Sequence, residues 1–537
     1  MSQRDDSFRM FAVGGLFLLA VVLSQLPWEG RVLLPSIFAA VSVFVLQRAL
    51  VGLLLGAALG CLMLSGLNPW RALMDFFNAH LLPSLKSEWN LSVLIFTLLL
   101  GGFAALVERG GGFRALFQSW IHGAPDSGRR VQWSAYVMGL ICFFDGLANS
   151  MMVGKSVGPV AKRCGISREK LAYIVDSTSS AVACVAIIST WIAYQLSMIR
   201  EGFAQAKIAD VNAFQVFVQS IPLNFYCWFT LILLAVVVHR NWNLGPMKSA
   251  ERELSNSSDG EADNTEASAW AALVPLAVLM AVLMGCLYFL GAKEPHPVTW
   301  SKLWSAFGAA PANQALLYAS ALACMAAFAF NARAIRRGGS PAGEVFLGGV
   351  SDLFVPCLIL VAAWALSSTV KALGAADYLT QILTGAVSVA WFPTIVFGAG
   401  MLISFTTGTS WGTMGILMPL VIPVALGLAS SGDAVAGAKD WSLVPPVVAA
   451  VFSGAVFGDH CSPLSDTTIV SSMACDLEPT RHVVTQLPYA LTAAAIAVVV
   501  GFIPSGFGLP GIVCLALGAI IIILLPRIVP PAAPAAD

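Results

Sequence analysis

Long apolar stretches alternate with short polar segments along almost the whole chain. Most of them reach or approach the roughly 20 apolar residues that a membrane-spanning helix needs. They lie at 10–27, 32–47, 49–67, 91–107, 131–160, 171–199, 214–238, 270–290, 313–330, 350–373, 391–428, 444–470, 483–503 and 509–527. This pattern predicts an all-α, polytopic membrane protein.

The basic residues indicate which side of the membrane each polar segment faces, because Lys and Arg concentrate in cytoplasmic loops. The stretch at 131–160 has a basic loop on each side, Arg109 to Arg130 before it and Lys162 to Lys170 after it. If this stretch crossed the membrane once, one of these loops would lie outside. We therefore predict that 131–160 is a re-entrant hairpin with both ends in the cytoplasm.

The stretch at 391–428 is about twice as long as one span and predicts a second hairpin, which enters from the opposite side. With these two hairpins the chain has about twelve transmembrane helices in two inverted-topology repeats, and both termini are cytoplasmic. Transporters use broken segments of this kind to form a site near the middle of the membrane. The predicted order is an N-terminal helix (1–30), a first repeat (31–238), a cytoplasmic polar loop (239–268), a second repeat (269–503), and a C-terminal helix with its tail (504–537).

The composition agrees with a membrane protein. Hydrophobic residues make up 58% of the 537 and charged residues 11%, whereas about 25% of the residues in soluble domains are charged. The net charge is zero, so no basic field predicts binding to nucleic acid. The eleven cysteines and six histidines are scattered without metal-ligand spacing. The scattered cysteines and histidines lead us to expect no cofactor. The apolar composition leads us to expect a chain that is integral to the bacterial inner (cytoplasmic) membrane and in contact with its lipid.

Four polar clusters interrupt the apolar stretches: Phe143–Gly154 and Phe405–Gly415 in the hairpins, and Asp176–Ser180 and Gly458–Ser472 in the spans that follow them. A charged carboxylate at membrane depth costs at least ~2.5–3.5 kcal/mol, so acids in such places point to a function. The simpler interpretation is that they are helix-end caps or side chains that reach the membrane surface. Hydroxyl, carbonyl and carboxylate oxygens suit a hard monovalent cation. A carboxylate held away from water also accepts a proton readily, because desolvation disfavours its charged form.

The clusters also match one another along the sequence. Three pairs are suggested: Asp145 with Thr409, Asn149 with Thr413, and Asp176-Ser177-Thr178 with Asp466-Thr467-Thr468. We expect the two members of each pair to occupy equivalent places in the two repeats.

These residues resemble the NhaC family of sodium/proton antiporters, within the wider ion transporter superfamily. The matching stretches run over 143–154, 166–183, 188–191, 407–425, 458–472 and 485–491, and the resemblance extends from about 90 to 500. It implies that sodium and protons are the coupling ions. The candidate sodium ligands are Asp145, Asp176, Asp459 and Asp466, and further candidates for the ion or substrate site are Asn149, Ser177, Thr178, Thr409, Ser410, Thr413 and Thr467. The chain departs from the family at Gly146, where relatives commonly carry a second acid.

We therefore expect a secondary active transporter rather than an enzyme, most simply a sodium/proton antiporter that works by alternating access. Relatives in the superfamily also move organic acids and amino acids, so a sodium- or proton-coupled transporter of such a solute is the alternative. A membrane hydrolase built on Asp459, His460 and Ser462 is the least favoured, because nothing supplies a metal or a nucleophile open to water. The expected partners are membrane lipid, a monovalent cation and, in the alternative, a small organic solute. A homodimer is left open.

Overall fold

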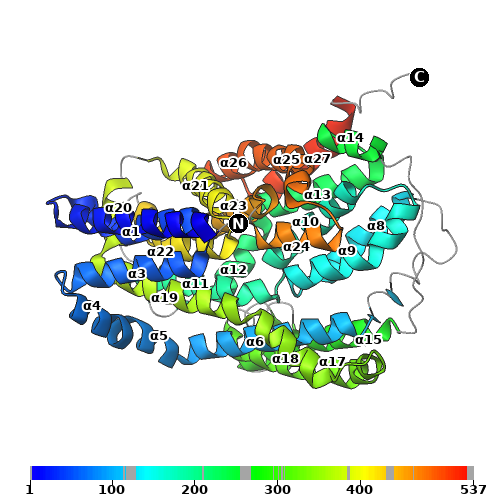
Figure 1. Ribbon diagram of the computed structural model, residues 1–537, viewed down its shortest axis with the longest axis horizontal. Coiled ribbons are helices and arrows are strands. Elements are labelled where there is room, and N and C mark those ends of the chain that lie inside the picture. Colours follow the sequence, from blue (N-terminus) through cyan, green and yellow to red (C-terminus); the bar gives the residue numbers. More distant parts are fainter. Residues whose placement is uncertain are drawn as a thin grey trace.

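The computed structural model describes residues 3–528 except for 47, 113–114, 117–127, 209–210, 254–267, 294–295, 300–301, 304–305, 307–308, 384–386, 431–440 and 464. Throughout this part of the chain the regular structure is helical (Figure 1). Ten helical segments of the described chain are long and apolar enough to cross a membrane, or thirteen if each of three bent helix pairs is one span. The all-α polytopic fold class is confirmed, and the predicted number of about twelve lies within this range.

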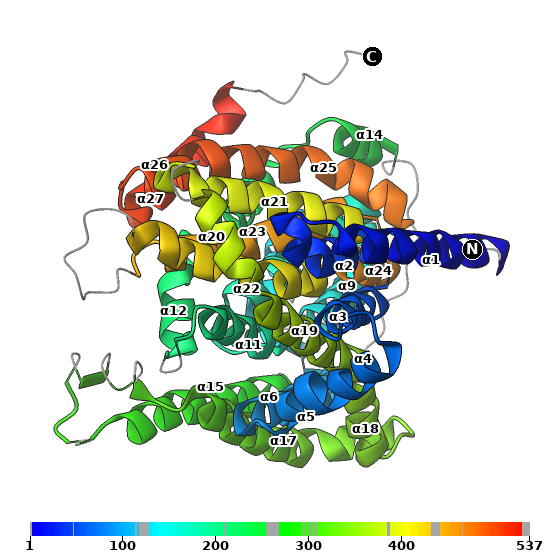
Figure 2. The same ribbon diagram turned by 90° about the vertical axis from the view of Figure 1, so that its left-hand side faces the viewer.

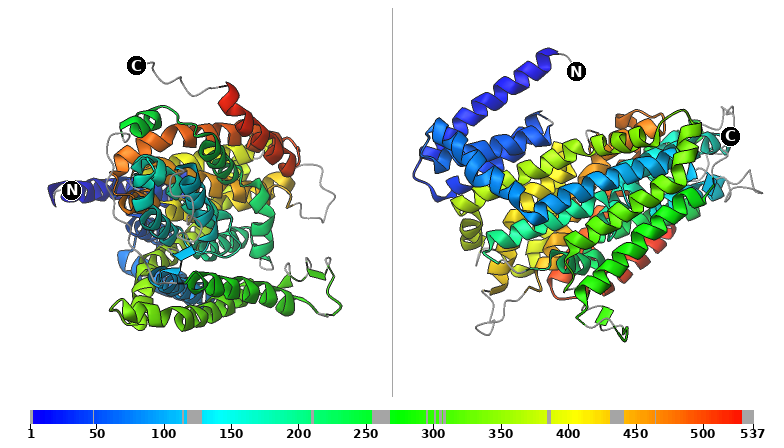
Figure 3. Two further views of the ribbon diagram at one scale, coloured as in Figure 1. Left: turned by 90° about the vertical axis from the view of Figure 1, so that its right-hand side faces the viewer. Right: turned by 90° about the horizontal axis from the view of Figure 1, so that it is seen from below.

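The first half of the chain contributes thirteen α-helical segments to the described structure. Their bounds are α1 (Gln3–Gln25), α2 (Leu34–Leu46), α3 (Ala49–Leu64), α4 (Pro69–Asp75), α5 (Leu82–Lys86), α6 (Glu88–Arg109), α8 (Gly128–Ile141), α9 (Gly146–Arg163), α10 (Arg168–Val185), α11 (Thr190–Gln205), α12 (Ala213–Ser220), α13 (Phe225–Arg240) and α14 (Pro246–Glu253). Helix α1 lies along α2 at the edge of the molecule (Figure 3). After α3 the chain turns by 117° into the segment 69–86, for which the sequence predicted no helix.

The second half contributes α15 (Trp270–Gly291), α17 (Ala312–Arg337), α18 (Ala342–Asp352), α19 (Phe354–Leu373), α20 (Ala375–Leu383), α21 (Phe392–Thr407), α22 (Ser410–Ser430), α23 (Val444–Cys461), α24 (Asp466–Ala474), α25 (Pro479–Ile496), α26 (Ile503–Gly506) and α27 (Gly511–Ile528). Helices α15, α17 and α18 pack with α6 as one layer along a side of the molecule (Figure 2). The core lies beside this layer and is built around α10 and α23.

The segment predicted as the first hairpin consists of α8 and α9, which pack along each other on either side of a break at 142–145. The two open ends meet, because a Cβ atom added at Gly128 would lie 3.0 Å from the carbonyl oxygen of Cys164. Asp145 ends the break as the N-cap of α9, and its Oδ1 accepts a hydrogen bond from the backbone N–H of Ala148 (2.7 Å). A capping side chain of this type favours the start of a new helix.

The second hairpin consists of α21 and α22 and has a similar design. Its tip contains Gly408 at φ +64°, a backbone conformation that glycine adopts without a steric penalty. Thr409 caps α22, since its Oγ1 accepts a hydrogen bond from the backbone N–H of Gly412 (3.2 Å). Asp145 and Thr409 therefore occupy equivalent places, as the sequence pairing predicted.

Each hairpin is followed by a broken helix. Helices α10 and α23 both have 18 residues, and each leads through a short break into a second helix, α11 or α24. Asp176 lies within α10, before its break, whereas Asp466 is the first residue of α24, after its break. The predicted pairing of these two acids is therefore wrong. Thr190, the first residue of α11, is the residue of the first repeat that corresponds to Asp466 in the second. The sequence pairing failed because two short runs of Asp, Ser and Thr match by composition alone, whereas corresponding residues lie at the same distance from the helix break.

The two repeats interlock reciprocally. Helix α9 of the first hairpin packs on α24, and its counterpart α22 packs on α11. The hydroxyls of Ser150 and Ser471 are hydrogen-bonded across the first contact (3.0 Å), and the Tyr194 hydroxyl donates to the carbonyl of Trp411 across the second (2.6 Å). In each repeat the second helix of the hairpin therefore packs on the second half of the broken helix of the other repeat. A two-fold relationship between the repeats requires this reciprocal packing.

Part of the predicted polar loop at 239–268 is helical. Its first residues complete α13, and α14 then packs on α10 and α25. Met247 and Ala250 supply the buried face of α14, and Glu251 Oε1 accepts a hydrogen bond from the backbone N–H of Ser167 (2.8 Å). Residues 254–267 of the loop and the C-terminal tail lie outside the described residues.

The hairpin makes a prediction about sidedness. Because α8 and α9 return to the same end, cysteines placed at Arg130 and Lys162 should both react with an impermeant thiol reagent from the cytoplasmic side. These cysteines should be introduced into a protein in which the partly exposed native Cys164 has been replaced, so that it does not react itself. A cysteine at Arg71, on α4 at the opposite end of the molecule (Figure 1), should react from outside. Labelling of Arg130 and Lys162 from opposite sides would contradict the hairpin.

Candidate functional site

A small cavity lies where the two hairpin tips meet the two helix breaks. Its volume is about 80 Å³, enough for an ion with very few water molecules, since each water occupies roughly 30 Å³ of liquid. Its oxygen-bearing lining residues are Asp145, Thr190, Thr409, Ser410, Asp459, Ser465, Asp466 and Thr467. Leu353, Val355, Pro356 and Ile359, at α19 and just before it, close one apolar wall. We call this space the cation cavity.

Four helices begin at the cation cavity. Helix α9 starts after Asp145, α11 at Thr190, α22 at Ser410 and α24 at Asp466. The N-terminus of a helix carries a partial positive charge and therefore stabilises a nearby anion. Asp145 and Asp466 stand at such N-termini, whereas Asp459 lies at the C-terminal end of α23, where the helix dipole gives its charge no support.

Asp145 joins the first hairpin tip to the first helix break. Its Oδ1 caps α9, and its Oδ2 accepts a hydrogen bond from the hydroxyl of Thr190 (2.8 Å). The backbone N–H of Thr190 in turn donates to the carbonyl of Phe144 (2.9 Å). Both carboxylate oxygens therefore have partners, and a movement of α11 relative to the hairpin would break these bonds.

Asp459 is the acid whose charge is least compensated. It lies in the last turn of α23 with 1% of its surface exposed. Its Oδ1 accepts a hydrogen bond from the Ser465 hydroxyl (2.9 Å), which also bonds with the Thr467 hydroxyl (3.1 Å). Its Oδ2 has no hydrogen-bond partner among the described residues. A cation or a proton at this oxygen would neutralise the charge, and burying a carboxylate without such compensation is very costly.

Asp466 and Thr409 complete the acid and hydroxyl lining of the cavity. Asp466 is the first residue of α24, on the more accessible side of the site, and Thr409 stands at the second hairpin tip. Nowhere in the described chain do three or more His, Cys, Asp or Glu side chains form a group that could hold a metal ion. The lining of the cation cavity offers carboxylate and hydroxyl oxygens, the type of ligand that hard cations prefer.

Asp176 lies outside the lining of the cation cavity. It is fully buried, its Oδ1 accepts a hydrogen bond from the Ser471 hydroxyl (3.1 Å), and its Oδ2 accepts one from the Gln486 amide (2.7 Å). His482 Nε2 is 3.5 Å from the same Oδ2. We call these four residues the Asp176 network. It connects α10, α24 and α25. No sequence pattern pointed to His482, whereas Gln486 lies within a motif shared with the resembled family.

Other candidate residues support the helices around the cavity. The Asn149 amide donates to the carbonyls of Gly139 (2.8 Å) and Thr178 (3.1 Å), which joins α9 to α8 and α10. The Thr413 hydroxyl donates to the carbonyl of Thr409 (2.8 Å) within its own helix. Neither of these residues, nor Ser177 or Thr178, is part of the cavity lining. A direct role in ion binding stays a prediction for them.

His460 lies beside Asp459 in α23 but is hydrogen-bonded to other helices. Its Nε2 is hydrogen-bonded to the Ser180 hydroxyl and its Nδ1 to the Tyr226 hydroxyl, both at 2.8 Å. Both ring nitrogens thus have partners other than Ser462, the serine that the sequence suggested. His460 connects α23 to α10 and α13, while Asp459 lines the cation cavity.

The sequence matches the Na+/H+ antiporter family over residues 182–507. A protein of Haemophilus influenzae is 30% identical over 91% of this chain and 94% of that protein. The malate-2H(+)/Na(+)-lactate antiporter of Bacillus subtilis is 34% identical over 29% of this chain and 32% of its own. Among solved structures, the YdaH transporter of Alcanivorax borkumensis has a similar fold, with a TM-score of 0.55 at 16% identity over 86% of this chain and 90% of that one.

Proposed function

Because the chain belongs to the Na+/H+ antiporter family, we propose that it exchanges sodium ions for protons across the bacterial inner membrane by alternating access. One observation carries the proposal. Asp459 presents a buried carboxylate oxygen without a hydrogen-bond partner among the described residues, on a cavity lined by hydroxyls. Sodium or a proton can neutralise this oxygen, and both cannot do so at once.

Competition for one carboxylate is sufficient for exchange. Sodium takes Asp459 Oδ2 together with hydroxyl oxygens from residues such as Ser410 and Thr467. When sodium leaves on one side, a proton from that same side neutralises the oxygen, and after the site reorients this proton leaves on the opposite side. An empty charged site would be costly at this depth, which disfavours reorientation without a bound ion.

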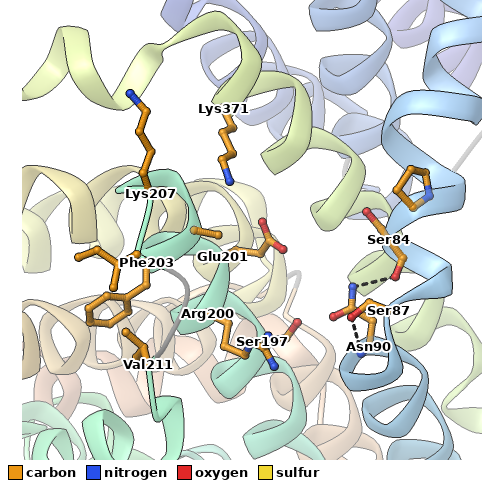
Figure 4. Close-up of a pocket in the computed structure, with 13 residues that line it drawn as sticks. Ser84, Ser87, Asn90, Ser197, Arg200, Glu201, Phe203, Lys207, Val211 and Lys371 are labelled. Atoms are coloured by element: carbon orange, nitrogen blue, oxygen red, sulfur yellow. Dashed lines mark hydrogen bonds between the residues drawn. The ribbon is translucent and has the colours of Figure 1, made fainter.

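Two larger cavities suggest the paths to each side. One, of about 440 Å³, lies between α9 and the end of α24, near Lys155, Lys162 and Asp476. The other, of about 580 Å³, lies at the end of α11 (Figure 4). Helices α11 and α24 thus each begin at the cation cavity and end at a wider one. Trp411, which lines the cation cavity, packs against Trp191 and Tyr194 of α11, with ring centroids 6.4 and 4.6 Å apart.

The proposal is tested with purified protein in liposomes. An outward sodium gradient should drive proton uptake, read with a pH dye inside the vesicles, and a proton gradient should drive sodium movement. Potassium in place of sodium is the control. Absence of proton movement under a sodium gradient would overturn the proposal.

Coupled transport of an organic solute is the second candidate. The Bacillus subtilis relative is named for an exchange of malate and protons against sodium and lactate. Gly146 also removes an acid that the resembled family commonly has beside Asp145, so a solute carboxylate would restore the missing negative charge. Sodium-driven uptake of a carboxylate, without sodium-driven proton movement, would favour this candidate.

Restoring an acid at Gly146 should change the charge carried per cycle. A Cβ atom there would be 3.7 Å from both Ser179 O and Trp191 Nε1, which is ordinary contact distance, so Gly146→Asp should fold. The new carboxylate at the start of α9 is favoured by the helix dipole. We expect more protons per sodium, measured as a shift of the membrane potential at which net flux reverses. Gly146→Ala is the matched control, and identical reversal potentials in the two variants would contradict this expectation.

A further inference from the structure

The cavity at the C-terminal end of α11 has the size of a small-molecule site. Its volume is about 580 Å³, within the roughly 300–1,000 Å³ of typical ligand pockets, whereas the cation cavity has about 80 Å³. Arg200 and Glu201 of α11 line it together with residues of the segment 83–90 and the end of α19 (Figure 4). It is distinct from the cation cavity, because Thr190 and Arg200 are about 15 Å apart along the helix at 1.5 Å per residue.

The described residues at this cavity carry more positive than negative charge. Lys371 points toward the carboxylate of Glu201 (Figure 4), and Glu201 Oε2 also accepts a hydrogen bond from the Ser367 hydroxyl (2.9 Å). Lys207 pairs with Asp377 at 3.5 Å, and both side chains are largely exposed. Glu201 also acts on its neighbour Arg200, so Lys371 and Arg200 share the charge of this one acid. Among the described residues the excess positive charge favours an anionic ligand, and Arg200 is the lining cation with the geometry to bind it.

Arg200 is held in an orientation that suits a carboxylate. Its guanidinium carbon lies 4.3 Å from the centroid of the Trp89 ring, so the flat face of the group rests on the aromatic surface. The N–H donors of a guanidinium point outward in its plane and match the two oxygens of a carboxylate. Stacking on one face leaves these edges available to a ligand in the cavity.

Two hydroxyls in the lining can bind a second oxygen of the same ligand. Ser87 Oγ accepts a hydrogen bond from the backbone N–H of Asn90 (3.4 Å), and Ser197 Oγ accepts one from Trp364 Nε1 (2.6 Å). In both bonds the serine oxygen is the acceptor, so its own hydrogen remains to be donated. The Asn90 side chain is in turn held by the carbonyl of Ser84 (2.9 Å), which fixes this rim of the cavity.

We propose that this cavity binds a short carboxylate anion that carries a further hydroxyl or carbonyl oxygen, with Arg200 on the carboxylate and Ser87 and Ser197 on the second oxygen. The inference goes beyond sodium/proton exchange, and it holds whether or not the cation cavity exchanges those two ions. An organic anion would then be recognised in the cavity at the end of α11, and not in the cation cavity among the acids at the hairpin tips.

The experiment compares two probes of the same shape on the full-length protein in detergent. Glycolate carries the carboxylate and hydroxyl, and glycolamide replaces the carboxylate with an uncharged amide. Calorimetry should detect glycolate binding at least tenfold tighter than glycolamide binding. Arg200→Gln should weaken glycolate at least tenfold, Arg200→Lys should fall between, and Arg71→Gln, on α4 and outside the cavity lining, should stay within twofold of the unaltered protein.

Equal binding of glycolate and glycolamide, or absence of binding of both, would overturn the proposal without any variant. Undiminished glycolate binding by a folded Arg200→Gln protein would overturn it as well. Ser197→Ala provides an independent check, since it should weaken glycolate more than propionate, which lacks the hydroxyl. Sodium-driven proton movement in liposomes is measured separately, so failure of the exchange mechanism and failure of this site are distinguishable.

Discussion

Replacing Asp459 with Asn is expected to abolish sodium-dependent transport while the protein stays folded and inserted. The substitution keeps the shape of the side chain and the acceptor for Ser465, but it removes the charge that Oδ2 presents to the cavity. Losing a charged ligand costs about 1.5–3 kcal/mol, which corresponds to a roughly 10- to 100-fold loss of sodium affinity. Calorimetric sodium titration and proton flux in liposomes would both measure it.

The matched control is Asp75→Asn on α4. Asp75 is an exposed acid 3.6 Å from Arg71, so its replacement should leave sodium affinity unchanged and alter stability little. Thermal unfolding in detergent should give the same midpoint for Asp459→Asn as for the unaltered protein, or a higher one, because an uncompensated buried charge has been removed. Full sodium coupling in Asp459→Asn would show that this carboxylate is not the exchanged ligand.

Asp176→Ala should act mainly on stability. Truncation removes the acceptor of the Ser471 hydroxyl and the Gln486 amide and leaves both donors buried without it. Breaking a buried polar network in this way costs about 3–5 kcal/mol. A strongly lowered unfolding midpoint and reduced yield of inserted protein are therefore expected, even without sodium in the buffer.

The conservative variant separates this role from ion binding. Asp176→Asn retains one acceptor oxygen and should lose less stability than Asp176→Ala. If Asp176→Ala instead unfolds at the normal temperature and loses sodium binding as Asp459→Asn does, then Asp176 is an ion ligand, as the sequence predicted, and the packing role assigned to the Asp176 network is incorrect.

The fold was predictable from the sequence where its cause is local. The two hairpins follow from apolar length and from basic loops on both sides of 131–160, and both quantities can be read from a short window. The break between α10 and α11 was not located, because Val185 to Ser189 contains neither glycine nor proline and reads as a continuous apolar run. The helical segment 69–86 was missed because its polar residues and two prolines interrupt the apolar pattern.

The site was predictable to the extent that it depends on isolated acids in apolar surroundings. Asp145, Asp459 and Asp466 meet at one cavity, as the clusters suggested, and Thr409 and Ser410 join them. The separate position of Asp176 depends on contacts with residues about 300 positions away, such as Ser471, which no local pattern contains. Arg200 was overlooked for a related reason, since it lies near the end of a stretch that the sequence treated as one uninterrupted span.

The reciprocal packing of the repeats has a consequence for how the protein is made. Helix α9 needs α24 as its partner, yet α24 leaves the ribosome about 300 residues later. At roughly 5–20 residues per second, the first hairpin waits on the order of tens of seconds with the hydroxyl of Ser150 uncovered. During this interval Ser150 keeps its intrahelical acceptor, the carbonyl of Gly146, but lacks the contact with Ser471 that joins the repeats. Biogenesis of this protein is therefore completed only when the second repeat arrives, and a chain truncated before α24 should be cleared by membrane proteases rather than accumulate as a stable half.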